Sequence, residues 1–128
     1  MFLRSLATAV PPNSFDQESC WEAMRDGNLL EGLKPRSATL MEKILTNGTS
    51  GIRRRNLALE SIGEIFDDGA ESLNRRFEQE ASPLAARSLT VALEKAGLRA
   101  DQVDALFLCT CTGYLCPGVT SHVAERAG

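Results

Sequence analysis

The most regular hydrophobic pattern of this 128-residue chain lies between Ala70 and Ala96 and predicts a long amphipathic helix. Pro83 falls inside the pattern, so either one helix kinks there or Ser82 caps a second helix. The periodicity continues through the proline and favours the single kinked helix. Gly97 follows the last periodic residue and predicts the end of the helix. The apolar positions are 70, 73, 77, 81, 84, 85, 89, 92, 93 and 96.

Shorter helices are predicted elsewhere in the chain. Amphipathic patterns at about residues 14–25 and 37–46 predict one helix each, and the Gly- and Ser-containing residues 47–51 between the second helix and the next element predict a loop. Another helix is predicted to begin near Thr120. None of these segments belongs to an internal repeat, so we expect a single domain rather than an array.

Two segments predict buried strands. Residues 105–110 form a continuous apolar run, which is typical of a strand covered by helices on both faces of a parallel sheet. Residues 6–10 predict a first strand, and residues 55–59 a short third one. The order of strand, helices and strand predicts an α/β fold. Because so small a sheet leaves edges uncovered, we expect the chain to be part of a larger fold.

Composition and charge narrow the class of protein. The chain is 43% hydrophobic and 24% charged with a formal net charge of −3, and it has no apolar run long enough to cross a membrane. The mild acidity argues against nucleic-acid or membrane partners. The N-terminal apolar run ends at Pro11-Pro12 and is too short for a secretory leader. Cysteines at 20, 109, 111 and 116 are too unevenly spaced for a disulfide framework, so a cytoplasmic protein is expected.

The segment 109–118 is the densest candidate for a functional site. It follows the predicted inner strand, and in open α/β sheets ligands bind beyond the carboxyl ends of the strands. Its three cysteines have no fourth metal ligand nearby, so a zinc or iron-sulfur site is disfavoured. Cys116, just ahead of the final helix, is the best placed to be a reactive thiol. The plainer interpretation is that small thiols pack and shape a pocket.

This same segment carries a resemblance to a known family. Its residues read Cys109-Thr110-Cys111-Thr112-Gly113-Tyr114-Leu115-Cys116-Pro117-Gly118, and they strongly resemble the segment after the corresponding strand in bacterial type III polyketide synthases, the chalcone and stilbene synthase family. Residues 6–12 resemble the family's first strand and turn, residues 51–55 its Gly-Ile-x-x-Arg motif, and residues 74–98 its long N-terminal helix. The resemblance covers nearly the whole chain in the right order.

The resemblance implies a fold and a reaction. The fold would be the N-terminal part of a thiolase-like domain spanning residues 1–128, in a homodimer. The reaction would be acyl transfer, condensing malonyl-CoA units onto an acyl-CoA starter without a cofactor or a metal. The family's cysteine, histidine and asparagine all match positions beyond Gly128, so no catalytic residue is assigned here. His122 matches none of them, and the chain alone is expected to be inactive.

Pocket and CoA residues can be carried over position by position. Cys111 and Thr112 match positions that line the family's acyl cavity, and Cys116 matches one that reaches into the partner subunit's cavity. Arg55 matches the motif arginine and is the candidate CoA contact. Thr49 stands where the family often has a basic CoA-binding residue, which weakens that assignment.

Other functions remain open from the sequence. The chain could be a non-catalytic dimerisation or regulatory fragment that binds synthase subunits through the Cys116 loop. It could be a fragment of a ketoacyl synthase III-like enzyme, which shares the fold and the Gly-Ile-x-x-Arg motif. A cysteine-ligated metal module is a third alternative. The starter, the product, the number of extensions and the mode of ring closure are not encoded in these residues.

Overall fold

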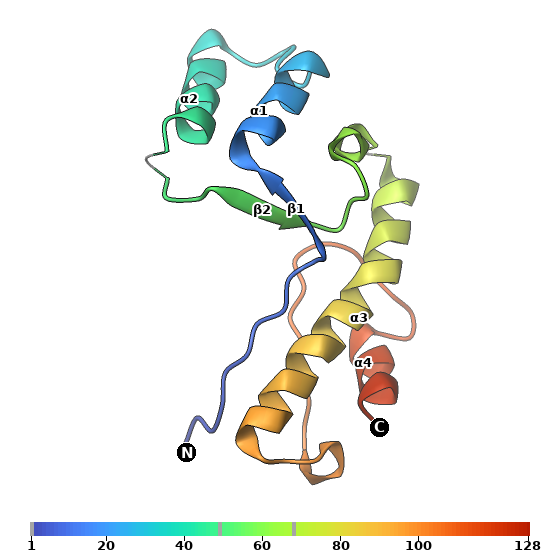
Figure 1. Ribbon diagram of the computed structural model, residues 1–128. Coiled ribbons are helices and arrows are strands. Elements are labelled where there is room, and N and C mark those ends of the chain that lie inside the picture. The colour runs from blue at the N-terminus through green and yellow to red at the C-terminus, as the bar shows by residue number, and fades with distance from the viewer. Residues whose placement is uncertain (1, 49, 68) are drawn as a thin grey trace. The chain divides into compact units, whose positions relative to one another are not determined.

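The computed structural model describes residues 2–48, 50–67 and 69–128, and these belong to two compact units. The first unit combines Met1–Val10 with Gly69–Gly128, and the second unit is the segment Pro11–Asp68 between them. Each unit has its own helices (Figure 1).

The long helix of the first unit is a single element, as its periodicity predicted. Helix α3 runs from Ala70 to Ala96 and continues through Pro83. It ends at Gly97, whose φ of 65° lies in the left-handed region that favours glycine. The Gly97 N–H donates to the Glu94 carbonyl at 3.1 Å. The predicted helix and its C-terminal end are therefore confirmed.

Helix α4 packs against α3 and completes the core of the first unit. It spans Val119–Ala127, which confirms the helix predicted near Thr120. Val119 and Val123 are buried against Ala86 of α3. Partly buried residues surround this centre, namely Phe77, Ala81, Ala85, Leu89, Leu106, Leu108 and Leu115. The inward residues of α3 recur every fourth position, which is the spacing of one helix face.

The two strands predicted in this unit are not formed. Residues 2–10 and 105–110 are extended but belong to no β-ladder, and the sheet found among the described residues pairs two other segments. The reason is that a strand requires a hydrogen-bonded neighbour, whereas these segments lie against α3 and its partners on one side. Side chains still alternate: Leu106 and Leu108 are half-buried, whereas Phe107 is 92% exposed.

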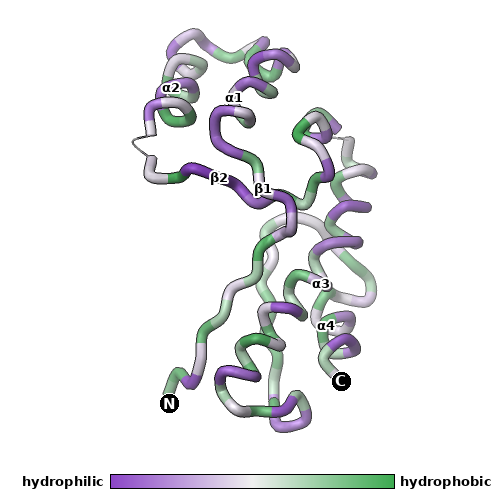
Figure 2. The backbone as a smooth tube through the Cα atoms, viewed as in Figure 1, coloured by the Kyte–Doolittle hydropathy of each residue, from purple (hydrophilic) through white to green (hydrophobic). Residues whose placement is uncertain are grey.

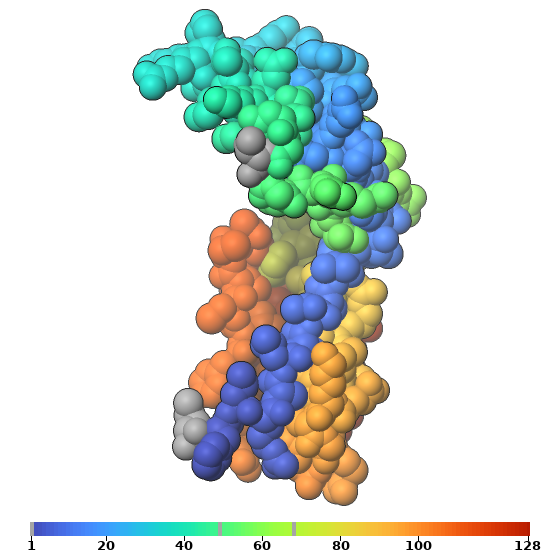
Figure 3. Space-filling view, turned by 60° about the vertical axis from the view of Figure 1, so that its left-hand side comes forward, coloured from blue at the N-terminus to red at the C-terminus, as the bar shows by residue number. Residues whose placement is uncertain are grey.

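Side-chain hydrogen bonds fix the N-terminal segment along α3. The Ser5 hydroxyl donates to the Ala92 carbonyl at 2.7 Å. Arg87 donates through Nη2 to the carbonyl of Val10 at 3.0 Å. Two anchors at opposite ends of the segment therefore hold it extended over the helix (Figure 3).

The second unit is built on a short antiparallel sheet. Strand β1 spans Asn13–Asp16 and pairs with β2 at Arg54–Leu57, with Phe15 opposite Arg55. The short strand predicted at 55–59 is thus present, shifted toward the N-terminus. The helix predicted from residue 14 begins only at Gln17, because residues 13–16 pair with β2 instead.

Two helices and a 3-10 turn complete this unit. Helix α1 spans Gln17–Asp26, and the Asp16 side chain accepts a hydrogen bond from the Ser19 N–H at 2.7 Å, which caps it. Helix α2 spans Pro35–Thr46 and packs beside α1 (Figure 1). The 3-10 helix η1 covers Ile62–Phe66, and a second one, η2 at Ala100–Gln102, belongs to the first unit. Within the described ranges, no helix has the length and apolarity needed to cross a membrane.

Candidate functional site

The motif loop of the first unit joins the extended residues 105–110 to α4. Gly113 has a φ of 77°, and the Cys116–Pro117 peptide bond is cis. The predicted pocket residues Cys111, Thr112 and Cys116 lie together on this loop with exposed side chains. The loop therefore presents all three to solvent within the unit that contains them.

The same loop is anchored to the core at two points. The Gly113 backbone lies directly against the Phe77 ring of α3, leaving no space for a side chain there. Leu115 is half-buried and packs against the core formed by Ala86, Val119 and Val123. These two contacts fix the course of the loop backbone. The exposed side chains of Cys111, Thr112 and Cys116 are therefore carried by a loop that is anchored to the core.

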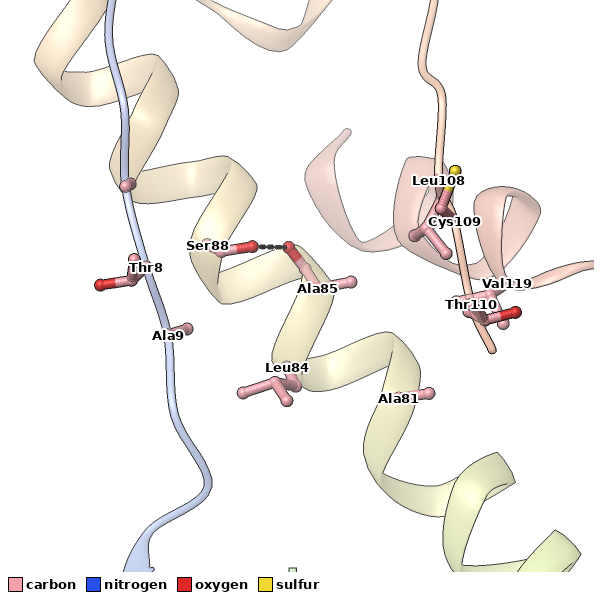
Figure 4. A pocket seen from close by; sticks show the side chains of 11 residues that line it. Thr8, Ala9, Ala81, Leu84, Ala85, Ser88, Leu108, Cys109, Thr110 and Val119 are labelled. Atoms are coloured by element: carbon pink, nitrogen blue, oxygen red, sulfur yellow. Dashed lines mark hydrogen bonds between the residues drawn. The ribbon is translucent and has the colours of Figure 1, made fainter. Parts of the chain in front are cut away.

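A groove of about 430 Å³ lies between the two extended segments and α3 (Figure 4). The view shows the N-terminal segment on one side of α3 and residues 108–110 on the other. A second hollow of about 360 Å³ shares Ala7, Ser88 and Leu108 with it and continues the groove. Both extended segments are mainly hydrophobic (Figure 2).

The groove is lined by the first two residues of the motif segment and by residues that lie outside that segment. Thr8, Ser88, Cys109 and Thr110 supply its polar side chains, and the remainder of the wall is aliphatic. The Ser88 hydroxyl donates to the Ala85 carbonyl at 2.9 Å, so its proton is already engaged (Figure 4). The signal that could have found them is the alternation within each extended segment, combined with the helix face at 81, 84, 85 and 88.

The chemistry available at this groove is binding. Hydroxyls and one thiol line an apolar channel, and its extended backbone segments have no strand partner among the described residues, an arrangement suited to binding another extended segment. His122 lies half-buried on α4. Within the described residues, no three side chains of His, Cys, Asp or Glu gather in a way that would hold a metal ion.

The fourth cysteine lies in the second unit and differs from the other three. Cys20 is buried on α1, whereas Cys109, Cys111 and Cys116 are exposed. Burial raises the pKa of the Cys20 thiol above its ordinary value, and the nearby Arg55 cation opposes that effect. Burial therefore disfavours the thiolate form of Cys20.

The predicted CoA contact also lies in the second unit. Arg55 is half-buried on β2 and donates through Nε to Gln17 Oε1 at 2.9 Å. Its neighbour Arg54 points the other way and donates to the Ser14 hydroxyl and carbonyl, each at 2.9 Å. The three consecutive arginines thus do not share one face. Thr49, which bears on the CoA prediction, lies outside the described residues.

Comparison with known proteins finds two similar synthases. No protein-family model matches the chain. Over 123 residues, 94% of this chain, it is 31% identical to a 1,3,6,8-tetrahydroxynaphthalene synthase of Streptomyces peucetius subsp. caesius. Over 122 residues, 95% of the chain, it is 24% identical to the synthase of the same name from Streptomyces coelicolor. Each match covers 31% of the relative, so the chain is similar, nearly end to end, to about a third of a tetrahydroxynaphthalene synthase.

Proposed function

We propose that this chain is part of a type III polyketide synthase, the enzyme class to which tetrahydroxynaphthalene synthases belong. The observation that carries the proposal is similarity to two such synthases over at least 94% of the chain. The Cys-Thr-Gly-Tyr-Leu-Cys-Pro-Gly motif at residues 111–118 of the loop adds support, because the motif is more specific to this family than the fold is.

The proposed fold is the N-terminal part of a thiolase-like α/β domain. Its support is that α3 and α4 cover one side of residues 105–110, while Phe107 on the other side is 92% exposed. An inner strand of a parallel sheet is apolar on both faces and covered on both, whereas this apolar segment is covered on one face only. Further strands filling the groove beside residues 5–10 would complete the sheet and bury the second face.

The proposed reaction is decarboxylative condensation of malonyl-CoA onto a starter held as a thioester. Loss of CO2 from the malonyl unit generates the nucleophilic carbon, which attacks the thioester carbonyl and expels the enzyme thiolate. That step requires an activated cysteine and oxyanion donors, which we place in other parts of the synthase. Cys111 and Thr112 would line the acyl cavity, and Cys116 would reach the neighbouring subunit of a homodimer. The CoA contact of Arg55 stays a prediction.

A chimera tests the proposal. In the Streptomyces peucetius synthase, the segment that matches this chain is replaced by residues 1–128, and malonyl-CoA consumption and CoA release are measured. We expect a turnover-competent chimera, and no turnover by the 128-residue chain alone. A chimera that melts cooperatively as a dimer but consumes no malonyl-CoA would contradict the proposal, as would extension of an acyl group by the isolated chain.

A further inference from the structure

The second unit contains a separate apolar cavity. It lies where α1 and α2 meet β2 and η1 and has a volume of about 320 Å³. Its lining residues come from four elements that are far apart in sequence. Its apolar lining residues include Cys20, Met24, Met41, Ile44 and Leu57.

This cavity has the properties of a small-molecule site. Its volume is at the lower end of the roughly 300–1,000 Å³ typical of ligand pockets, so it suits a small ligand. Met24 of α1 and Met41 of α2 both line it, and methionine side chains adapt readily to a ligand. Aliphatic and thioether walls favour an apolar occupant over water.

One cation interrupts the apolar wall. Arg55 lines the cavity and is the charged residue among those that do so. Its Nε donates to Gln17 Oε1 at 2.9 Å, and Gln17 is only 6% exposed. The Gln17 side chain in turn donates to the Ser50 hydroxyl at 3.3 Å. A buried, hydrogen-bonded amide therefore holds the guanidinium in place.

The guanidinium retains donors for a ligand. Within the described part of the chain its hydrogen bond is the one from Nε, and no carboxylate pairs with it. Two terminal nitrogens remain, and their planar arrangement suits a carboxylate. The cavity thus combines an apolar interior with a positioned, unneutralised cation.

We propose that this cavity binds a medium-chain fatty carboxylate, with the alkyl chain between α1 and α2 and the carboxylate on Arg55. The charge of Arg55 selects an anionic head, and the apolar walls select an alkyl tail. The site lies within the second unit and includes no residue of the motif loop. Its failure would therefore leave the proposed synthase function untouched.

Direct titration of the full chain with sodium octanoate tests this site. Trp21 is the single tryptophan, is buried, and follows the cavity residue Cys20, so its fluorescence reports occupancy. We expect saturable binding of octanoate below its micelle concentration, and binding weaker by about tenfold or more for octanol and for acetate. Equal binding of octanol and octanoate would overturn the proposal, as would no binding of octanoate.

Substitutions distinguish the contribution of the carboxylate head to binding from that of the alkyl tail. Arg55→Met should weaken octanoate binding by about tenfold or more and leave octanol binding unchanged, whereas Arg53→Met, at an exposed arginine of the same run, should change neither. Met41→Phe, which fills the cavity, should weaken the binding of both octanoate and octanol. Unchanged octanoate affinity in folded Arg55→Met would refute the proposed contact.

A second measurement needs no change at Arg55. In a Cys109→Ser, Cys111→Ser, Cys116→Ser variant, Cys20 is the remaining thiol. Octanoate should slow its alkylation by a small thiol reagent in a saturable way, and acetate should not. Alkylation at the same rate with and without octanoate would overturn the proposal even if Arg55→Met fails to fold.

Discussion

The ring of Phe77 occupies the space in which a side chain on Gly113 would lie. This contact joins the N-terminal third of α3 to the motif loop, and the Gly113 φ of 77° is a second reason for glycine there. Gly113→Ala should therefore destabilise the chain by at least about 2 kcal/mol, through backbone strain and overpacking. Urea unfolding followed by circular dichroism measures the loss.

The control for this substitution is Gly63→Ala. A Cβ at Gly63 would lie 3.7 Å from Ser61 Oγ, an ordinary contact, so little change is expected. Because the ring causes part of the penalty, Gly113→Ala should cost less in a Phe77→Ala background than alone. Equal costs in both backgrounds would show that the ring does not contribute.

The hydrogen bond from Ser5 to the Ala92 carbonyl should help to hold the N-terminal segment. Ser5→Ala is expected to cost about 0.5–1.5 kcal/mol, the net contribution of one hydrogen bond. It should also speed hydrogen exchange and proteolysis in residues 2–10. Thr8→Ala, at an exposed position of the same segment, is the matched control. If both variants lose protection equally, the hydroxyl of Ser5 is not the anchor.

The cap of α1 should make stability depend on pH in acid. The Ser19 N–H and hydroxyl hold the pKa of the Asp16 carboxyl below its ordinary value. A depressed folded pKa adds stability that is present above the unfolded pKa, near pH 4, and disappears as the pH falls through the folded value. Asp16→Asn keeps a capping oxygen but does not titrate.

Urea midpoints of wild type and Asp16→Asn should therefore converge as the pH falls from about 6 to about 3, with the wild type ahead at the higher pH. Carboxyl carbon chemical shifts would give the Asp16 pKa directly. A wild-type advantage that is the same at both pH values would contradict the cap's electrostatic contribution.

Neighbouring residues of the extended segment should respond oppositely to a charge. Phe107 is 92% exposed, so Phe107→Lys should leave the melting temperature nearly unchanged while reducing self-association. Leu108 is half-buried against the core, so Leu108→Lys should destabilise by about 1–3 kcal/mol. Sedimentation velocity and thermal melts separate the two effects. Equal destabilisation by both would mean that this segment does not alternate as the structure shows.

Local pattern was enough to identify the helices. The 3.6-residue period and Gly97 predicted α3 and its end, and the apolar spacing before and after it predicted α2 and α4. These features depend on contacts between residues close in sequence, which a single chain encodes directly. The sequence also singled out the segment 109–118, because its small polar residues and glycines follow the predicted inner strand.

Pairing between distant segments was decided by tertiary structure alone. The sequence predicts a helix from residue 14, but residues 14–16 instead pair with Arg54–Asn56, and the strand that it predicts at residues 105–110 has no partner among the described residues. A strand exists only where another segment supplies hydrogen bonds, and no local pattern specifies which segment that is. For the same reason, the sequence determined the residues of the groove and the Arg55 cavity, but only the fold brought each set together.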